Sequence, residues 1–384
     1  MNRDQELELG ERLAALFADG PAPADGAPVV VPASVYSCVD RHRSELAAIA
    51  ARPVVALHGT EIPEPGNFRA VELGGLPLLV VRGRDGVVRA LVNACAHRGA
   101  TVERETAGTA RAFSCSFHGW SYELDGSLRS VADAALFSSA PCGRGLRSVA
   151  CEERHGIVWV TTDPDPDPRP VAEWLGPDLD GLLGMLGFGE AVFYAATEYE
   201  VACNWKLLTD GFLELYHLKY LHRTTIAPYL PANSWLVDRC GEHFRVSIPK
   251  NRLGRHLAAR ERDEWQVWSD LSMPVVLVPG SVLQWQAGHF EVFSFRPHRD
   301  DPGRTTCRLS MLVPADRVDE HELWERNWDR VRVTIPDEDF AVAEQVQRNI
   351  ASGAVRELQI GRNERGLVDH LAAVDRLVAE VAAR

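Results

Sequence analysis

Two short pairs of cysteine and histidine constrain the fold of this chain more than any other feature. Cys95 and His97 lie in "NACAHRGA", and Cys115 and His118 lie in "FSCSFHGWSY", with 17 residues between the pairs. A glycine follows each pair, and short apolar runs broken by Gly, Pro and Asn flank both, a texture typical of strands joined by turns. The sequence therefore predicts two loops of a β-rich segment, each presenting one thiol and one imidazole.

Three interpretations of these pairs predict different ligand patterns. Chance does not readily place two such pairs, each followed by a turn signal, so close together. A structural zinc site of the Cys2His2 type usually has its histidines together on a helix. A Rieske [2Fe–2S] cluster has two cysteines on one iron and two histidines on the other, so each of two facing loops supplies one of each. The mixed pairs favour the Rieske cluster, whose histidine ligands raise the reduction potential and suit it to relaying electrons.

The segment "NWKLLTDGFLELYHLKYLHR" carries a second candidate site. Glu214 and His217 are three apart and share a face of a helix, which the pattern predicts over residues 203–220. His217 and His222 are five apart, about 140° around a regular helix, so they converge only where the helix bulges or ends between them. The alternative is an amphipathic helix with incidental histidines. Two histidines and a carboxylate form the facial triad of non-haem Fe(II) oxygenases.

The two motifs, in this order, resemble those of Rieske-type non-haem iron oxygenases. The resemblance is to the terminal oxygenase (alpha) subunit of the aromatic ring-hydroxylating dioxygenase family, and it covers about residues 35–355. It implies a [2Fe–2S] Rieske cluster and a mononuclear Fe(II) as cofactors. The implied cluster ligands are Cys95, His97, Cys115 and His118, and the implied iron ligands are His217, His222 and an aspartate on a late helix.

The segment "EDFAVAEQVQ" matches the family pattern E-D-x4-E-x2-Q, which assigns the third iron ligand to Asp339. Asp337 and Glu338 are the alternatives. The pattern also predicts a helix over residues 319–352, in which Pro336 and Asp337 look like a helix start with acidic residues placed as the helix dipole favours. On that interpretation the acidic residues would only cap a helix.

Glu214 stands where many relatives have an aspartate. The resemblance implies a homotrimer in which this carboxylate bridges a cluster histidine of one subunit and an iron histidine of the next, so that electrons cross between subunits. The bridged residues would be His118 and His217. The chain lacks the extra length of many alpha subunits that pair with a β subunit, which favours the homotrimer.

The expected fold class is α+β, with two domains in 384 residues. Residues 53–165 are expected to form an all-β Rieske domain, in which Asp85-Gly86 marks a hairpin turn. Residues 171–384 form a catalytic domain that the resemblance predicts to be helix-grip-like, an antiparallel sheet with helices. Residues 1–52 form a helical segment that packs on the catalytic domain. The proline-rich stretch "DPDPDPRP" separates the two domains, because it suits neither a helix nor a central strand.

Composition excludes several functions. The net charge of −13 argues against binding nucleic acid or an acidic membrane surface. No apolar run approaches the ~18 residues that a membrane span needs. The start of the chain lacks the pattern of a signal peptide, and the eight cysteines are too irregularly spaced for a disulfide framework. A cytoplasmic location is therefore expected.

The expected activity is that of an oxygenase which uses O2 and electrons from NAD(P)H. No dinucleotide-binding fingerprint occurs in the chain, so the nicotinamide and flavin would sit on a separate flavin/iron–sulfur reductase, with or without a ferredoxin. The substrate would be a small organic molecule, with aromatic compounds among the candidates, that is mono- or dihydroxylated or oxidatively demethylated. The rival interpretations are an electron-transfer protein without oxygenase activity and a zinc-dependent hydrolase. Candidate pocket residues, equally compatible with a core, are Ile226, Trp285, Phe293 and Phe295.

Overall fold

The computed structural model describes residues 3–19, 27–137, 144–164, 168–231 and 234–383. It divides into two compact units, a smaller one of Ile49–Trp174 and a larger one formed by Met1–Ala48 together with Leu175–Arg384. The proline-rich stretch predicted as a domain boundary is only partly described, because residues 165–167 lie outside these ranges. None of the helices in the described ranges is both long and apolar enough to cross a membrane.

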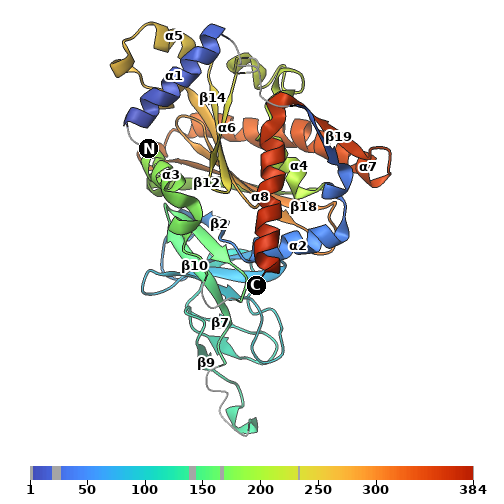
Figure 1. The fold of residues 1–384 in the computed structure, drawn as a ribbon. Coiled ribbons are helices and arrows are strands. Elements are labelled where there is room, and N and C mark those ends of the chain that lie inside the picture. The colour runs from blue at the N-terminus through green and yellow to red at the C-terminus, as the bar shows by residue number, and fades with distance from the viewer. Residues whose placement is uncertain (1–2, 20–26, 138–143, 165–167, 232–233, 384) are drawn as a thin grey trace. The chain divides into compact units, whose positions relative to one another are not determined.

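The smaller unit consists of antiparallel strands. A seven-stranded sheet has the order β2-β11-β10-β5-β4-β3-β6, and a three-stranded sheet has the order β7-β8-β9 (Figure 1). The strands of the larger sheet are β2 (Val54–His58), β3 (Asn67–Leu73), β4 (Leu76–Arg82), β5 (Val88–Val92), β6 (Ala107–Thr109), β10 (Ser148–Arg154) and β11 (Ile157–Thr161). Those of the smaller sheet are β7 (Phe113–Ser114), β8 (Ser121–Tyr122) and β9 (Leu128–Ser130).

Strands β4 and β5 form the predicted hairpin. Arg82 pairs with Val88, and Gly86 in the turn has a φ of 79°, which a residue with a Cβ rarely adopts. Successive residues of β4 point to opposite faces of the sheet, so Leu79 belongs to one apolar cluster and Leu78 to another. Both faces of this sheet are therefore buried, and the cluster that contains Leu79 also supports the two Cys–His loops.

The larger unit is built on a second seven-stranded antiparallel sheet, in the order β12-β18-β17-β16-β15-β14-β13. Its strands are β12 (Ala191–Val201), β13 (Leu236–Cys240), β14 (His243–Pro249), β15 (Leu271–Leu277), β16 (Ser281–Trp285), β17 (Phe290–Pro297) and β18 (Thr305–Pro314). The helices are α1 (Arg3–Asp19), α2 (Val39–Ala50), α3 (Val171–Leu186), α4 (Trp205–Asp210), α5 (Leu253–Ala258), α6 (His321–Thr334), α7 (Ala341–Ala351) and α8 (Arg365–Ala382). Strands β1 (Val29–Pro32) and β19 (Glu357–Ile360) pair separately.

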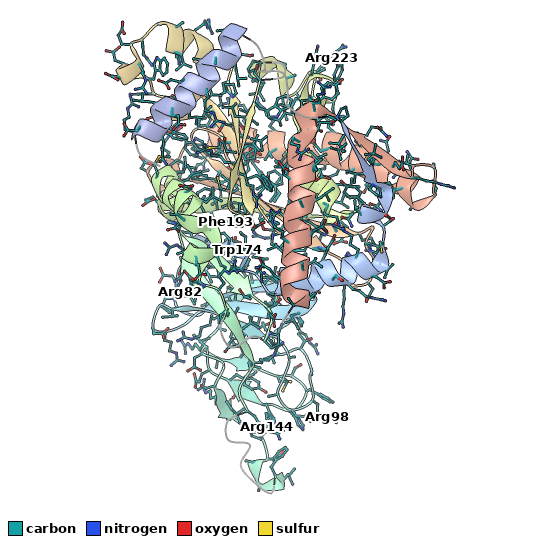
Figure 2. All side chains as sticks on the ribbon, viewed as in Figure 1. Arg82, Arg98, Arg144, Trp174, Phe193 and Arg223 are labelled. Atoms are coloured by element: carbon teal, nitrogen blue, oxygen red, sulfur yellow. The ribbon has the colours of Figure 1, made fainter. Side chains whose placement is uncertain are left out.

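Helices cover the sheet of the larger unit. Helix α4 lies against β17, and α6 lies against β12 and β18 (Figure 1). Side chains fill the space between these layers (Figure 2). Helix α1 packs beside α5, where Leu9 and Leu13 share an apolar cluster with Leu253 and Val267. The overall content is the α+β combination expected from the sequence, with an antiparallel sheet in each unit.

Two helical predictions need correction. The helix predicted over 203–220 stops at Asp210, after six residues, and turns lead to a short 3-10 helix at His217–Lys219. The predicted range 319–352 is helical, but Pro336 and Asp337 lie inside it instead of at a helix start. A π-helical segment, Ile335–Phe340, joins α6 to α7 without a break. Proline has no N–H to donate, and the wider π turn accommodates it within a continuous helix.

Candidate metal centres and cavity

The two Cys–His loops share one backbone arrangement. The N–H of Gly99 donates to the carbonyl of Cys95 at 2.8 Å, and that of Gly119 donates to the carbonyl of Cys115 at 3.0 Å. The N–H of each cysteine donates in turn to the carbonyl five residues later, which for Cys95 is that of Ala100. Gly99 and Gly119 have φ values of 77° and 69°, so each tight turn depends on its glycine.

These loops place two thiols inside the unit and two imidazoles nearer its surface. Cys95 and Cys115 are buried in the apolar cluster beneath the loops. The rings of His97 and His118 lie with their centroids 4.6 Å apart, and His97 stacks on Trp120 at 4.9 Å. Nδ1 of His97 is buried and, among the described residues, has no hydrogen-bond partner. Two thiols, two imidazoles and an unused ring nitrogen fit the ligand set of a Rieske cluster.

Tyr122 is a polar neighbour of this site that the sequence motif alone did not identify. Its hydroxyl accepts the N–H of Ala96 at 3.0 Å and lies 3.0 Å from Sγ of Cys95, so the O–H proton can point at the sulfur. Burial and the contact with Cys95 raise the pKa of Tyr122, which keeps it protonated. A hydrogen bond to a ligand sulfur is one of the protein's means of raising a cluster's potential. The sequence signal available for this contact was the tyrosine that ends the segment "FHGWSY".

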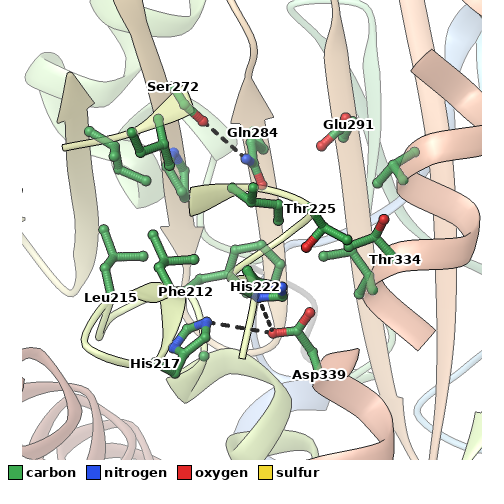
Figure 3. Close-up of a pocket in the computed structure, with 18 of the residues that line it drawn as sticks. Phe212, Leu215, His217, His222, Thr225, Ser272, Gln284, Glu291, Thr334 and Asp339 are labelled. Carbon is green, nitrogen blue, oxygen red and sulfur yellow. Dashed lines mark hydrogen bonds and ion pairs between the residues drawn. The ribbon is translucent and has the colours of Figure 1, made fainter. Parts of the chain in front are cut away.

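In the larger unit, His217, His222 and Asp339 converge on one point (Figure 3). Oδ1 of Asp339 lies 3.2 Å from Nε2 of His222 and 3.6 Å from Nε2 of His217. One ligand atom from each residue lies within 4.8 Å of the others, the only such group of three among the described residues. Oδ2 of Asp339 is buried without a hydrogen-bond partner in the described part of the chain. These features fit a single metal ion held by two histidines and one carboxylate.

The end of α4 allows this convergence. Asn204 caps the helix by accepting the N–H of Lys206 at 3.0 Å, and the helix stops at Asp210. The chain leaves the helix before it reaches Glu214. The side chains of His217 and His222 therefore do not have to point in the different directions that a regular helix would impose. The sequence predicted that the helix must bulge or end, and it ends. It ends earlier than expected, ahead of both histidines.

The second ring nitrogen of each histidine is bonded to a carboxylate. Nδ1 of His217 lies 2.6 Å from Oε1 of Glu214, which also accepts backbone N–H groups through its other oxygen. Nδ1 of His222 bonds Glu338, whose carboxylate also accepts the Thr225 hydroxyl at 2.8 Å. Carboxylates in these positions fix the orientation and the tautomer of metal-binding imidazoles.

The structure separates the three acidic candidates for the third ligand. Asp339 faces Nε2 of both histidines, Glu338 bonds the opposite nitrogen of His222, and Asp337 is exposed. Burial lowers the pKa of His222, but the nearby Asp339 and Glu338 outweigh burial, and the pKa is raised. The site is therefore electronegative and suited to a cation. The inter-subunit role of Glu214 remains a prediction.

A cavity of about 720 Å³ opens beside this group, entirely within the larger unit. Figure 3 shows Ser272 and Gln284 on the sheet across the cavity from His217 and Asp339. Gln284 donates to the Ser272 hydroxyl at 3.2 Å. Of the residues suggested as pocket lining, Ile226 lines the cavity. Trp285, Phe293 and Phe295 are not among its lining residues, and the two phenylalanines are core residues.

The two units match two protein families. Residues 52–140 match the family described as "Rieske [2Fe-2S] domain". Residues 188–380 match the family described as "Ring hydroxylating alpha subunit (catalytic domain)". The four loop residues lie in the first range, and both histidines and Asp339 lie in the second.

Curated relatives include both dioxygenases and a monooxygenase. The chain is 33% identical to chlorobenzene dioxygenase subunit alpha of Cupriavidus sp. over 227 residues, which cover 53% of this chain and 47% of that protein. It is 27% identical to the glycine betaine monooxygenase oxygenase subunit of Chromohalobacter salexigens over 356 residues, covering 80% and 76%. The matched part spans about half the length, or less, of most of the curated relatives.

Solved structures share the fold. A quaternary ammonium Rieske monooxygenase in complex with L-carnitine aligns with a TM-score of 0.75 and 20% identity, covering 89% of this chain and 94% of the other. Naphthalene 1,2-dioxygenase from Rhodococcus sp. aligns with a TM-score of 0.74 and 19% identity, covering 98% of each. With the two family matches, these comparisons show that the chain belongs to the ring-hydroxylating alpha-subunit family of Rieske-type non-haem iron oxygenases.

Proposed function

We propose that this chain is the terminal component of an oxygenase system that inserts oxygen from O2 into a small organic molecule. The observation that carries the proposal is the group of His217, His222 and Asp339 beside a cavity of about 720 Å³, in a chain that also has the two Cys–His loops. An electron-transfer protein needs the loops alone. A substrate-sized cavity next to a metal-binding group is expected of an enzyme.

The chain's own residues would prepare the site. When bound, the cluster supplies single electrons and the mononuclear Fe(II) supplies open coordination positions where O2 can react. Glu214 and Glu338 orient the two imidazoles so that each Nε2 faces Asp339. The largely apolar cavity wall positions the substrate and excludes water from the reacting end.

Electrons would come from NAD(P)H through a separate flavin/iron–sulfur reductase, with or without a ferredoxin. We propose a homotrimer, in which Glu214 lies at the boundary between one subunit's His118 and the next subunit's His217. The expected mass in solution is then three times the 42.4 kDa of one chain. Light scattering on the purified protein measures it directly, and a monomer would contradict this part of the proposal.

The names of the relatives leave the reaction open. Chlorobenzene dioxygenase and glycine betaine monooxygenase differ in both substrate and oxygen stoichiometry. For this chain we therefore propose mono- or dihydroxylation or oxidative demethylation as a class. Turnover with a reconstituted reductase, followed by the product mass, distinguishes one added oxygen from two and from loss of a methyl group.

Metal analysis tests the assignment before any substrate is known. The loaded protein should contain about three irons and two sulfides per chain and show the visible spectrum of a Rieske cluster. Two irons and two sulfides with no mononuclear iron would favour an electron-transfer protein. A colourless zinc protein would favour a hydrolase. Either result would overturn the proposed function.

A further inference from the structure

Lys250 places a positive charge in the wall of the cavity. It follows β14, and its Nζ donates to the backbone carbonyl of Gln286 at 3.2 Å. An ammonium group has three protons to donate, so this contact uses only one. Among the described residues, no carboxylate lies within 4.0 Å of Nζ. Burial and the nearby Arg252 lower the pKa of Lys250, and the charge of Asp270, which is paired with Arg252, offsets only part of this effect.

Two other basic residues of the cavity wall have their own carboxylates. Arg252 is paired with Asp270, and Arg317 is paired with Glu320 at 2.7 Å. Lys250 therefore differs from Arg252 and Arg317, because no carboxylate in the described part of the chain is paired with it.

A fourth basic residue of the cavity wall, Arg330, is exposed to solvent. The guanidinium of Arg330 lies over the ring of Tyr229, 5.3 Å from its centroid. The carbonyl of Tyr229 accepts the N–H of Asn251, the residue after Lys250, so both cations border the Tyr229 segment. Within the described ranges Arg330, too, has no carboxylate within 4.0 Å. Lys250 and Arg330 are therefore two cations of the cavity wall that have no described carboxylate in contact, which favours an anion over a cation beside them.

Glu291, one of the acidic residues of the cavity wall, does not form an ion pair with Lys250. Glu291 is buried in the cavity wall, but its oxygens accept from Nε2 of Gln286 at 3.1 Å and lie 3.3 Å from Nε2 of His289. The side chain of Gln286 thus bonds Glu291 while its backbone carbonyl bonds Lys250. The two charged residues share a neighbour without forming an ion pair.

We propose that the substrate carries an anionic head group, a carboxylate or a sulfonate, which binds Lys250 with Arg330 at its side. This inference rests on the proposed function and specifies its substrate class. An anion at Lys250 would accept the unused ammonium protons and offset the cost of a desolvated charge. The rest of the substrate would extend through the apolar part of the cavity toward His217, His222 and Asp339.

Binding of matched probes, measured by calorimetry without turnover, tests the inference. The probes are 3-phenylpropionate, 2-phenylethanesulfonate, the neutral 3-phenylpropan-1-ol and the cationic 3-phenylpropylamine, added under nitrogen to protein loaded with iron and cluster. The variants are Lys250→Met, which removes the charge, and Lys250→Arg, which keeps it. Arg255→Met is the control, because Arg255 is an exposed cation on α5 that does not line the cavity.

The unmodified protein should bind at least one anion about tenfold more tightly than the alcohol and bind the amine most weakly. The stronger anion identifies the head group. Lys250→Met should lose this preference with unchanged affinity for the alcohol, whereas Lys250→Arg and Arg255→Met should keep it. Equal affinity for all probes, no measurable binding of either anion, or an anion preference that survives Lys250→Met would overturn the inference. Since binding is read without O2, its failure is separate from a failure of the oxygenase assay.

Discussion

At the scale of single residues, two carboxylates that are adjacent in the sequence make different contacts with the same histidine. Glu338 and Asp339 are neighbours in the sequence, yet they face opposite nitrogens of the same imidazole of His222. The motif "EDFAVAEQVQ" assigned Asp339, but the spacing of charges alone could not choose between neighbours. The choice depends on how the helix is wound at that point, which local sequence does not specify.

Replacing these two carboxylates should therefore have unequal effects. Asp339→Ala removes one of the three proposed protein ligands and should abolish binding of the mononuclear iron and turnover. Glu338→Ala removes only the partner of Nδ1 of His222 and should weaken iron binding by about ten- to hundredfold. Anaerobic iron titration measures both, with the visible spectrum of the cluster as the control for folding. If Asp339→Ala keeps its iron while Glu338→Ala loses it, the third ligand has been misassigned.

Glu214→Gln should slow electron transfer without removing a metal. The amide keeps the shape of the side chain but removes the charge that holds Nδ1 of His217. The cluster should be reduced at the normal rate. Its reoxidation with O2 and substrate should slow by roughly a hundredfold or more. Stopped-flow absorbance of the cluster measures both steps, and Glu357→Gln, at an exposed position of β19, is the control. Reoxidation at the normal rate would show that Glu214 acts only within its own loop.

At the scale of elements, sequence patterns predicted a hairpin turn and one long helical range correctly, but they missed where α4 ends and how the helix is wound at Pro336. The hairpin at Gly86 and the helical range 319–352 are correct, because turn chemistry and periodicity are local. The length of α4 and the place of Pro336 were wrong. Both errors concern segments where bonds to distant residues, such as Glu338 to His222, hold the chain in a less common conformation.

A buried ion pair fixes α4 against α2, and breaking it should destabilise the larger unit. Nζ of Lys206 lies 2.5 Å from Oε2 of Glu45, and both side chains are almost completely buried. Lys206→Met leaves buried Glu45 with Arg41 and the indole N–H of Trp205 as partners, and should lower the free energy of unfolding by roughly 3 kcal/mol. Lys206→Met with Glu45→Gln should recover much of that loss.

Urea unfolding followed by tryptophan fluorescence measures these changes. Arg43→Met on the exposed side of α2 is the matched control and should change the free energy by less than about 0.5 kcal/mol, because both members of its pair with Asp40 are exposed. A loss for Lys206→Met no larger than that of the control would mean that the buried pair contributes little to stability.

At the scale of the whole molecule, the two units have separate apolar cores. The cluster of residues beneath the Cys–His loops lies wholly within Ile49–Trp174. The sequence predicted two domains and an N-terminal helical segment packed on the second, and in the structure Met1–Ala48 and Leu175–Arg384 form the larger unit.

Cys95→Ser or His118→Cys should therefore abolish or alter the visible spectrum while the larger unit stays folded. Each change removes or replaces a proposed cluster ligand in the smaller unit and leaves the sheet of the larger unit unchanged. Retention of mononuclear iron at His217, His222 and Asp339, measured by metal analysis, is the control for folding. An unchanged spectrum and unchanged activity would contradict the assignment of these ligands.

The pairing of β1 with β19 has a consequence for biosynthesis. Val31 lies opposite Leu358, so a strand made early must wait for one made more than 300 residues later. The smaller unit, encoded as one continuous stretch between them, can close while the ribosome is still translating the rest. At about 5–20 residues per second, β1 would remain without its partner strand for at least ~15 seconds. Nascent chains stalled before residue 357 should therefore hold a folded cluster-binding unit, with β1 still open to proteases.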